Sequence, residues 1–249
     1  MKSVGIIPAR WKSSRFPGKS LCLISGKPML QRVIEQSEKT KTLDKIIVAT
    51  DDLRIFDFVN SLNKQNVCPM ITKKNHPTGT DRIAEIAEKL NVENIINIQG
   101  DEPIIDPNLI DKINLTLNNK EWDMSSAATL IEDKSEINNK SVVKVVFNQN
   151  CKALYFSRLP IPFNRDDKNL KPCYWKHIGI YGYKKKFLLK MSSSPPSILE
   201  KYEKLEQLRA LHLGANLCII KTEHHSIGVD TPNDIAKVEK IIKESINYD

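Results

Sequence analysis

The chain has 249 residues, of which 40% are hydrophobic and 27% are charged. This balance excludes a disordered or fibrous protein, and the length suffices for one domain over residues 1–249 with a substantial core. The net charge of +8 suggests phosphate binding. Many lysines lie beside glutamates, as in residues 199–211, and no aromatic and basic RNA-binding motif is present, so we expect no nucleic-acid partner.

Short apolar runs alternate with segments of helical period in the first hundred residues. The runs at residues 3–8, 45–50 and 94–98 are rich in Ile or Val and predict buried strands. Apolar residues at three- and four-residue spacing predict helices that begin at Pro28, Asp52 and Thr80. The alternation predicts an α/β fold of three layers, with a mostly parallel, Rossmann-like sheet and helices on both faces.

Beyond residue 120 the pattern changes to consecutive strand-like runs without long helices between them. The sequences SSAATL, VVKVVF and KALYFS are three such runs, and they predict an antiparallel subregion over about residues 120–190. Helical character returns in residues 199–214 and in residues 231–245, where Thr231 is the expected N-cap before Pro232.

The segment over residues 6–19, IIPARWKSSRFPGK, runs from an apolar strand into a loop that carries four cations. These cations are Arg10, Lys12, Arg15 and Lys19. Pro8 has no N–H to continue a sheet, and Ser13, Ser14 and Gly18 add hydroxyls and a flexible backbone that approach phosphate oxygens closely. The pattern favours a triphosphate-binding loop; a solvated basic loop is the alternative.

Two aspartates are candidate ligands for a hard cation. Ligands of α/β sheets bind beyond the carboxyl ends of the strands, and the segment Gln99–Pro103 follows one strand there, with Asp101 after Gly100. Asp230 precedes the last predicted helix, and Thr231 leaves it available as a second ligand. Turn or helix capping is the alternative for both. Oxygen ligands suit Mg²⁺, which would align a triphosphate for displacement at phosphorus.

Other features of the chain are less specific. No apolar run approaches the ~20 residues that cross a bilayer, and no secretory signal is recognisable, so we expect a cytoplasmic protein with no membrane partner. The five cysteines are scattered without C-x-x-C spacing, which indicates neither a disulfide framework nor a zinc site.

A series of motifs resembles, in order and spacing, the 3-deoxy-manno-octulosonate cytidylyltransferases, also called CMP-Kdo synthetases. The motifs are IIPAR…SSRFPGK, TGTDR, QGDEP, ALYFSR, HIGIYGY, LEQLR and GVDTP. The first is shared with other sugar nucleotidyltransferases, but the complete series spans nearly the whole chain. The resemblance implies a nucleotidyltransferase-type fold, a homodimer formed through part of the antiparallel subregion, and Mg²⁺ as cofactor. The implied reaction converts CTP and Kdo to CMP-Kdo and pyrophosphate, for lipopolysaccharide.

The resemblance also implies roles for individual residues. Arg10, Arg15 and Lys19 would contact the phosphates, with Lys19, Arg10 and Asp101 as the catalytic residues and Asp101 with Asp230 as the metal ligands. Cytosine and ribose are assigned to residues at three places in the chain. These are Pro8, then Gly79, Thr80 and Arg82, and finally Gln99.

The implied sugar pocket takes its residues from the second half of the chain. They are Arg158, Arg165, His177, Tyr181, Glu206 and Gln207. A guanidinium suits a sugar carboxylate, and the other groups can exchange hydrogen bonds with hydroxyls. Without the resemblance, Tyr181 would be interpreted as sheet packing and Glu206 as a solvated helix residue.

Two alternatives remain at this point. One is a cytidylyltransferase for 8-amino-3,8-dideoxy-Kdo or for a sialic acid. The more remote one is a non-catalytic nucleotide- or RNA-binding protein that uses the basic surface.

Overall fold

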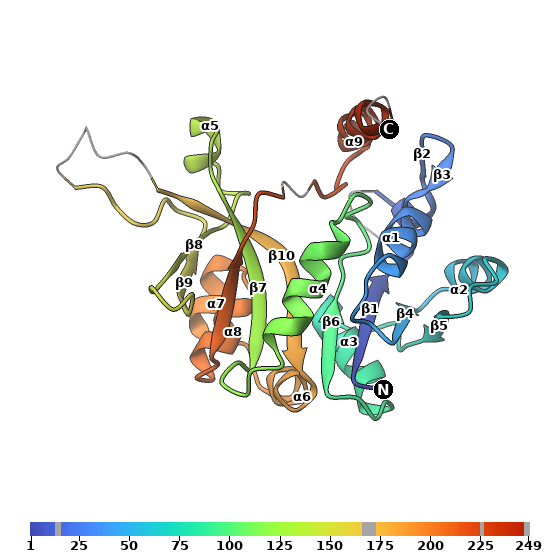
Figure 1. Ribbon diagram of the computed structural model, residues 1–249, viewed down its shortest axis with the longest axis horizontal. Helices are drawn as coiled ribbons and strands as arrows, with labels where there is room; N and C mark the ends of the chain where they lie inside the picture. Colours follow the sequence, from blue (N-terminus) through green and yellow to red (C-terminus); the bar gives the residue numbers. More distant parts are fainter. Residues whose placement is uncertain (13–15, 166–172, 225–226, 247–249) are drawn as a thin grey trace.

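A mixed β-sheet organises the protein in the computed structural model, which describes residues 1–12, 16–165, 173–224 and 227–246 (Figure 1). Nine described strands form this sheet, with the order β11-β7-β10-β6-β1-β4-β5 and the pair β8 and β9 off this path. The strands are β1 (Ser3–Ala9), β4 (Lys45–Thr50), β5 (Val67–Ile71), β6 (Asn94–Asn97), β7 (Met124–Leu130), β8 (Lys144–Phe147), β9 (Ala153–Ser157), β10 (Trp175–Lys184) and β11 (Leu217–Lys221). A small hairpin, β2 (Leu23–Ile24) with β3 (Lys27–Pro28), lies apart.

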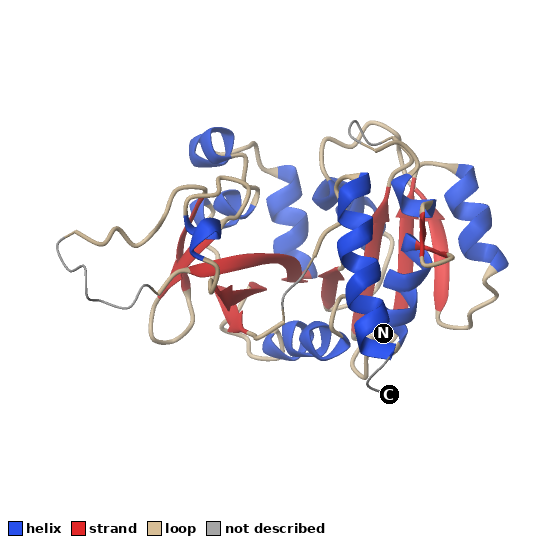
Figure 2. Ribbon diagram, turned by 90° about the horizontal axis from the view of Figure 1, so that it is seen from above, coloured by secondary structure: helices blue, strands red, loops and turns tan. Residues whose placement is uncertain are grey.

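Helices cover both faces of the sheet (Figure 2). The helices are η1 (Lys19–Leu21), α1 (Met29–Glu38), α2 (Leu53–Ser61), α3 (Gly79–Glu88), α4 (Pro107–Thr116), α5 (Lys134–Ile137), α6 (Lys185–Ser193), α7 (Ile198–Glu203), α8 (Gln207–His212) and α9 (Pro232–Ile246). Ile6 of β1 lies in the hydrophobic core around α3, α6 and α8, whereas Ile7 lies in the core around α1, α2 and α4. Successive residues of a strand point to opposite faces, so one apolar run supplies both cores. The three predicted layers and the α/β class are confirmed.

The predicted strands and helices of the first hundred residues are confirmed within one or two residues. β1 pairs in parallel with β4 and β6, and β4 pairs in parallel with β5. The carboxyl ends of these strands therefore lie at one edge of the sheet. Strand β5 has no counterpart among the predicted strands, because its sequence VCPMI carries a proline that argues against a strand.

The second half of the chain contributes to the same sheet. β10 is antiparallel to both β6 and β7, and β7 is parallel to β11, so β7 and β10 lie inside the main sheet. Among the strands of the described ranges, the antiparallel pair β8 and β9 stands off the path of the main sheet, beside β10. The expected antiparallel subregion thus consists of two central strands and one hairpin.

The predicted helix over residues 199–214 is wrong in one respect, because the structure divides it into α7 and α8. Lys204 ends α7 in the left-handed region, with φ 55° and ψ 48°, and its N–H donates to the carbonyl of Glu200 at 2.8 Å. Leu205 then lies buried in the core. The turn leaves Glu206 and Gln207 at the start of α8, next to the sheet.

The C-terminal helix α9 packs on the β2–β3 hairpin. Ile24, Met29, Val229 and Val238 are all fully buried in this contact, and the backbone N–H of Ser25 donates to Glu239 at 2.6 Å. Among the helices of the described ranges, none has the length and apolar character needed to span a bilayer.

Gly182 provides a test of the packing of β10. A Cβ atom there would lie 2.5 Å from Ser125 Oγ on β7 and 2.9 Å from Ile113 Cγ2 on α4. We expect Gly182→Ala to lower the free energy of unfolding by about 1–3 kcal/mol, because it overpacks the layer between sheet and helix. Chemical denaturation measures this.

Gly228→Ala is the matched control, since a Cβ atom there has nothing within 4 Å. It should change the free energy of unfolding by less than about 0.5 kcal/mol. Equal stability of the Gly182→Ala protein and the wild type would show that β10 does not pack against α4 as described.

Candidate active site

A cleft of about 390 Å³ opens at the carboxyl ends of β1 and β6. It is lined by residues from four parts of the chain, namely Pro8, Arg10, Lys12, Lys19, Ser20, Gly79, Gln99, Gly100, Asp101 and Asp230. The ends of β1 and β6 thus line a cleft at the edge of the sheet where α/β proteins bind their ligands. The end of β4 does not reach this lining. Its Asp51 binds Arg82, and its Asp52 caps α2 by accepting the N–H of Arg54 at 3.0 Å.

Lys19 lies between the two predicted metal ligands. Its Nζ donates to Asp101 Oδ2 at 2.7 Å and to Asp230 Oδ1 at 3.3 Å, and also to the carbonyl of Val229 at 3.0 Å. Burial alone would lower the pKa of Lys19, but the two carboxylates outweigh it and raise the pKa above its usual value. The ammonium is therefore charged at neutral pH.

Asp234 holds the turn that presents Asp230. Its Oδ2 accepts the backbone N–H groups of Asp230 at 3.2 Å and of Thr231 at 3.0 Å, and the hydroxyl of Thr231 at 2.8 Å. Burial would raise the pKa of Asp234, but these hydrogen bonds and Lys237 lower it to about 2. Helix α9 begins at Pro232, so Thr231 stands at the predicted N-cap position; its carbonyl accepts the N–H of Asp234 at 3.0 Å, and its hydroxyl donates to the Asp234 carboxylate. Asp230 is left facing Lys19.

Gly100 allows the chain to pass close to the strand that supplies Pro8. A Cβ atom at residue 100 would lie 2.8 Å from the carbonyl oxygen of Pro8. Gly79 begins α3 directly above Pro8, and a Cβ atom there would lie 3.6 Å from the proline ring. The absence of a side chain at Gly100 therefore lets two strand ends of the cleft lining pack closely together.

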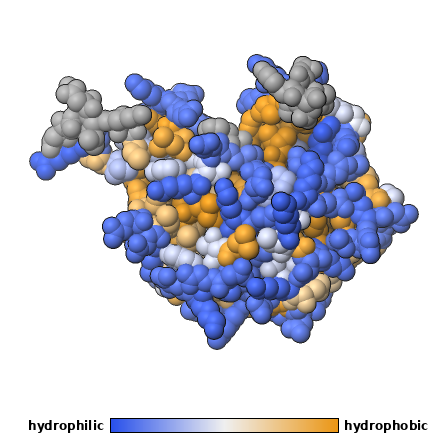
Figure 3. Space-filling view, in the orientation of Figure 1, coloured by the Kyte–Doolittle hydropathy of each residue, from blue (hydrophilic) through white to orange (hydrophobic). Residues whose placement is uncertain are grey.

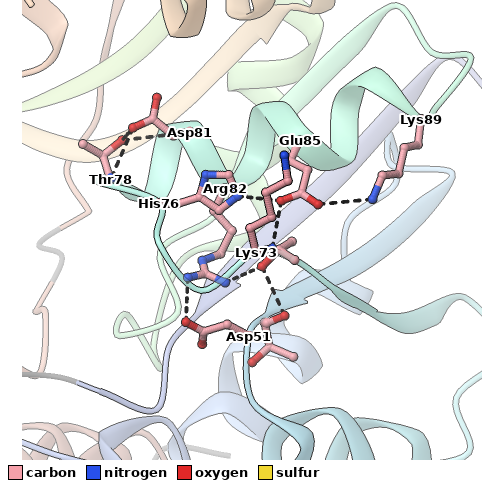
Figure 4. A network of polar contacts seen from close by, with 10 residues as sticks. Asp51, Lys73, His76, Thr78, Asp81, Arg82, Glu85 and Lys89 are labelled. Carbon is pink, nitrogen blue, oxygen red and sulfur yellow. Dashed lines mark hydrogen bonds and ion pairs between the residues drawn. The ribbon is translucent and has the colours of Figure 1, made fainter.

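Arg82 lies beneath the cleft, not in its lining. It is fully buried on α3, and its guanidinium donates to Asp51 Oδ2 at 3.0 Å and to Thr72 Oγ1 (Figure 4). Burial lowers the pKa of Arg10, and the nearby positive charge of Arg82 lowers it further. The role of Arg82 toward the nucleotide stays a prediction.

The same close-up shows how the loop before α3 is held (Figure 4). Glu85 accepts His76 Nε2 at 2.5 Å and the backbone N–H of Lys73 at 3.0 Å. Burial would raise the pKa of Glu85, but these hydrogen bonds and one from Lys89 lower it to about 2. This anchor was not predicted from the sequence, where His76 matches no motif. The spacing of a histidine nine residues before a helical glutamate carries no signal.

Trp11 joins the two flanks of the predicted phosphate loop. Its carbonyl accepts the N–H of Gly18 at 2.9 Å, and its ring packs against Gly18, where a Cβ atom would lie 3.1 Å from Trp11 Cζ2. The guanidinium carbon of Arg54 lies 3.5 Å from the centre of the Trp11 ring. The contact joins residues far apart in sequence, so sequence patterns could not show it. Arg15, Ser13 and Ser14 lie outside the described residues.

A second group of polar residues lies beside the cleft on the α3 face of the sheet. Glu206 Oε2 accepts the Thr80 hydroxyl at 2.6 Å, and Gln207 Oε1 accepts the Tyr181 hydroxyl at 3.3 Å. Burial raises the pKa of Tyr181, and the negative charge of Glu206 raises it further. The phenol is therefore a neutral hydrogen-bond donor. Thr80, Tyr181, Glu206 and Gln207 are thereby brought together from three elements.

His177 extends this group along β10. Its Nε2 lies 2.8 Å from Ser126 Oγ, and its ring centre lies 5.4 Å from that of Tyr181. Burial lowers the pKa of His177 to about 3, so the imidazole is neutral. Gln99 connects the group to the cleft, because its Nε2 donates to the Gly179 carbonyl at 2.8 Å and leaves its Oε1 as an acceptor for a ligand.

The structure does not bring Arg158 and Arg165 into this group. Arg158 donates to the carbonyls of Glu203 at 2.6 Å, Lys140 at 2.9 Å and Lys204 at 3.4 Å, and so holds the end of α7. Arg165 is exposed in the segment after β9. Their predicted contacts with a sugar stay predictions.

The carboxylates of Asp101 and Asp230 fit a divalent cation. Both lie close enough to bind one ammonium, which marks the place between them as favourable for positive charge. Within the described ranges, no group of three or more His, Cys, Asp or Glu side chains forms a further metal centre. Mg²⁺ is typically held by one or two carboxylates together with substrate phosphates, so two aspartates match this cation.

Comparisons with known proteins agree over nearly the whole chain. The family described as cytidylyltransferase matches residues 4–221. The 3-deoxy-manno-octulosonate cytidylyltransferase of Solibacter usitatus is 46% identical, covering 98% of this chain and 96% of that protein. Its counterpart in Geobacter sulfurreducens is 44% identical, covering 98% of this chain and 100% of that protein.

Solved structures agree with these relatives. A CMP:2-keto-3-deoxy-manno-octonic acid synthetase complexed with CTP superposes with a TM-score of 0.92 and 37% identity, covering 98% of this chain and 100% of that one. A 4-diphosphocytidyl-2C-methyl-D-erythritol synthase from Anaerococcus prevotii, with a TM-score of 0.64 and 17% identity, covers 97% of this chain and 96% of that one and shares the fold. The chain belongs to the 3-deoxy-manno-octulosonate cytidylyltransferase family.

Proposed function

We propose that this protein transfers CMP from CTP to the anomeric hydroxyl of Kdo and releases pyrophosphate, with Mg²⁺ as cofactor, to supply activated Kdo for lipopolysaccharide. The observation that carries the proposal is the position of Lys19 between Asp101 and Asp230, in the same cleft as Arg10 and Gly100. Cations for a triphosphate and carboxylates for a metal meet there at a sheet edge typical of nucleotide sites.

The reaction exchanges one phosphorus–oxygen bond for another. The anomeric oxygen forms a bond to the α-phosphorus, the bond to the bridging oxygen breaks, and its electron pair leaves with pyrophosphate while the hydroxyl proton is released. Arg10 and Lys19 stabilise the negative charge on the phosphates as it shifts toward the leaving group. Positioning and charge stabilisation supply most of the rate in such transfers.

Asp101 and Asp230 would hold Mg²⁺, which neutralises phosphate charge and aligns the triphosphate when bound. Pro8, Gly79 and Gly100 line the same cleft and would contact the nucleoside. Glu206, Gln207 and Tyr181 lie next to this cleft and offer both donors and acceptors. Such a set suits a polyhydroxylated sugar better than an apolar ligand.

The substrate test is pyrophosphate release with CTP, ATP, GTP or UTP, with and without Kdo and with and without Mg²⁺. We expect release only with CTP, Kdo and Mg²⁺ together, because the site binds the base, the sugar and the metal in one cleft. Release with UTP at the same rate would contradict the base assignment. A higher kcat/KM for 8-amino-3,8-dideoxy-Kdo or a sialic acid than for Kdo would contradict the assignment of Kdo as the sugar substrate.

The metal ligands are tested by Asp101→Asn and Asp230→Asn. Each variant loses a carboxylate charge toward Mg²⁺ but keeps its shape, so kcat should fall by about hundredfold or more while the melting temperature changes little. Steady-state kinetics over a Mg²⁺ titration measures the effect.

Asp133→Asn is the control for these two variants. Asp133 caps the remote helix α5 by accepting the N–H of Ser135 at 2.8 Å, and its replacement should leave kcat unchanged. Near-normal kcat in both site variants would rule out a metal held by these two aspartates.

We also propose that the protein forms a homodimer through an apolar surface on β9, α7 and the segment that follows β9. Its exposed residues are Leu154, Leu159, Phe163, Ile198, Leu199 and Tyr202. Figure 3 shows apolar side chains on the side of the molecule that carries β8 and β9. Exposed clusters of this kind usually mark an interface, and a second copy of the same patch is its simplest complement.

The double variant Phe163→Asp, Tyr202→Asp tests this surface, since these side chains are 84% and 81% exposed. Two charges per copy should convert a dimer into a monomer in sedimentation velocity at micromolar concentration. Leu115→Asp on α4, at a leucine that is 53% exposed, is the control and should leave the dimer intact. A wild-type protein that sediments as a monomer would contradict the proposal.

A further inference from the structure

The ammonium of Lys19 has a hydrogen-bond acceptor for each of its donors. An ammonium carries three N–H groups, and those of Lys19 are directed to Asp101 Oδ2, Val229 O and Asp230 Oδ1. The Lys19 side chain is only 16% exposed. In this arrangement no N–H of Lys19 remains for a phosphate oxygen. Lys19 must therefore release at least one of its acceptors before it can bind a triphosphate.

The acceptors that Lys19 would release are the same two carboxylates that suit a divalent cation. Asp101 and Asp230 are 30% and 48% exposed and lie at 2.7 Å and 3.3 Å from Nζ. A divalent cation on these oxygens would lie within a few ångströms of a like charge. Two cations so close repel each other strongly in a partly buried site.

We propose that in the nucleotide-free protein the Lys19 ammonium occupies the divalent-cation site as an internal counter-ion, and that it moves to the phosphates when CTP and the divalent cation bind. This inference rests on the function proposed above and deepens it. It assigns Lys19 two successive positions, first on the carboxylates and then on the triphosphate.

The exchange couples the two ligands energetically. Without nucleotide, a divalent cation must displace an ammonium that would keep only the Val229 carbonyl as an acceptor, so the affinity for the cation is low. With CTP present, the triphosphate accepts the displaced ammonium, and the carboxylates become available. By linkage, the divalent cation then raises the affinity for CTP by the same factor.

The backbone contacts indicate which parts would stay in place during this exchange. The N–H of Val229 donates to the carbonyl of Asp101 at 2.9 Å, and Asp234 holds the backbone of Asp230. Val229 is fully buried against the β2–β3 hairpin. The two carboxylates are therefore fixed by their backbones, and the long side chain of Lys19 is the part that can move.

The test is Mn²⁺ binding in the absence of any nucleotide, measured by electron paramagnetic resonance. Lys19→Met removes the charge but keeps most of the side-chain volume, so it should bind Mn²⁺ at least tenfold more tightly than the wild type. Lys19→Arg keeps the positive charge and should bind Mn²⁺ as weakly as the wild type. Lys19→Gln replaces Lys19→Met in this comparison if the methionine variant does not fold.

Lys27→Met is the matched control, since Lys27 pairs with Glu35 at 2.7 Å on α1 and should not affect Mn²⁺ affinity. Unchanged or weaker Mn²⁺ binding by the neutral variants would overturn the proposal, as would tight binding by Lys19→Arg. Pyrophosphate release by the wild type is scored separately. An active wild type with no gain in Mn²⁺ affinity on removal of the charge contradicts the counter-ion role alone, and an inactive wild type contradicts the proposed function.

Discussion

The three hydrogen bonds of Lys19 hold together parts of the chain that are distant in sequence. They join the segment after β1 to Asp101, which lies 82 residues later, and to Asp230, which lies 211 residues later. Removing a charged amine from water is costly, and only a full set of good acceptors offsets that cost. The Lys19 ammonium therefore has its full set of acceptors only when the end of β6 and the segment before α9 are both in their folded positions. This requirement ties the geometry of the cleft to the completion of the fold.

The antiparallel strand β10 places polar side chains beside the cleft. It lies beside β6 with Tyr181 opposite Asn97, so its polar side chains reach the region where the parallel strands end. A register irregularity between Ile178 and Tyr181 accompanies the carbonyl of Gly179 that accepts the amide of Gln99. In an all-parallel sheet, the strand beside β6 would run parallel to it and would be joined through a helical crossover. The mixed sheet instead places the cleft and the polar group of Tyr181, Glu206 and Gln207 side by side.

Local patterns sufficed for the parts of the fold that depend on local physics. Strands β1, β4 and β6 follow from their Ile and Val runs, and the rule for strand ends predicted the edge of the sheet at which Asp101 lies. The break at Lys204 did not follow, because a left-handed lysine has no sequence signal and is stabilised by the burial of Leu205. The partners of individual arginine side chains could not be deduced from the sequence either. The guanidinium of Arg158 binds backbone carbonyls and that of Arg54 lies on Trp11, and both contacts depend on tertiary packing.

Charge pairing explains why a site built for a highly charged ligand can fold without it. Arg82 is paired with Asp51 and Lys19 with Asp101 and Asp230, so the strongest charges near the cleft have partners in the nucleotide-free protein. Unpaired carboxylates at this depth would repel each other, and unpaired cations would destabilise the end of the sheet. A triphosphate with its divalent cation brings both signs of charge together. In the exchange proposed above, Lys19, Asp101 and Asp230 would therefore have partners of opposite charge both before and after the ligand binds.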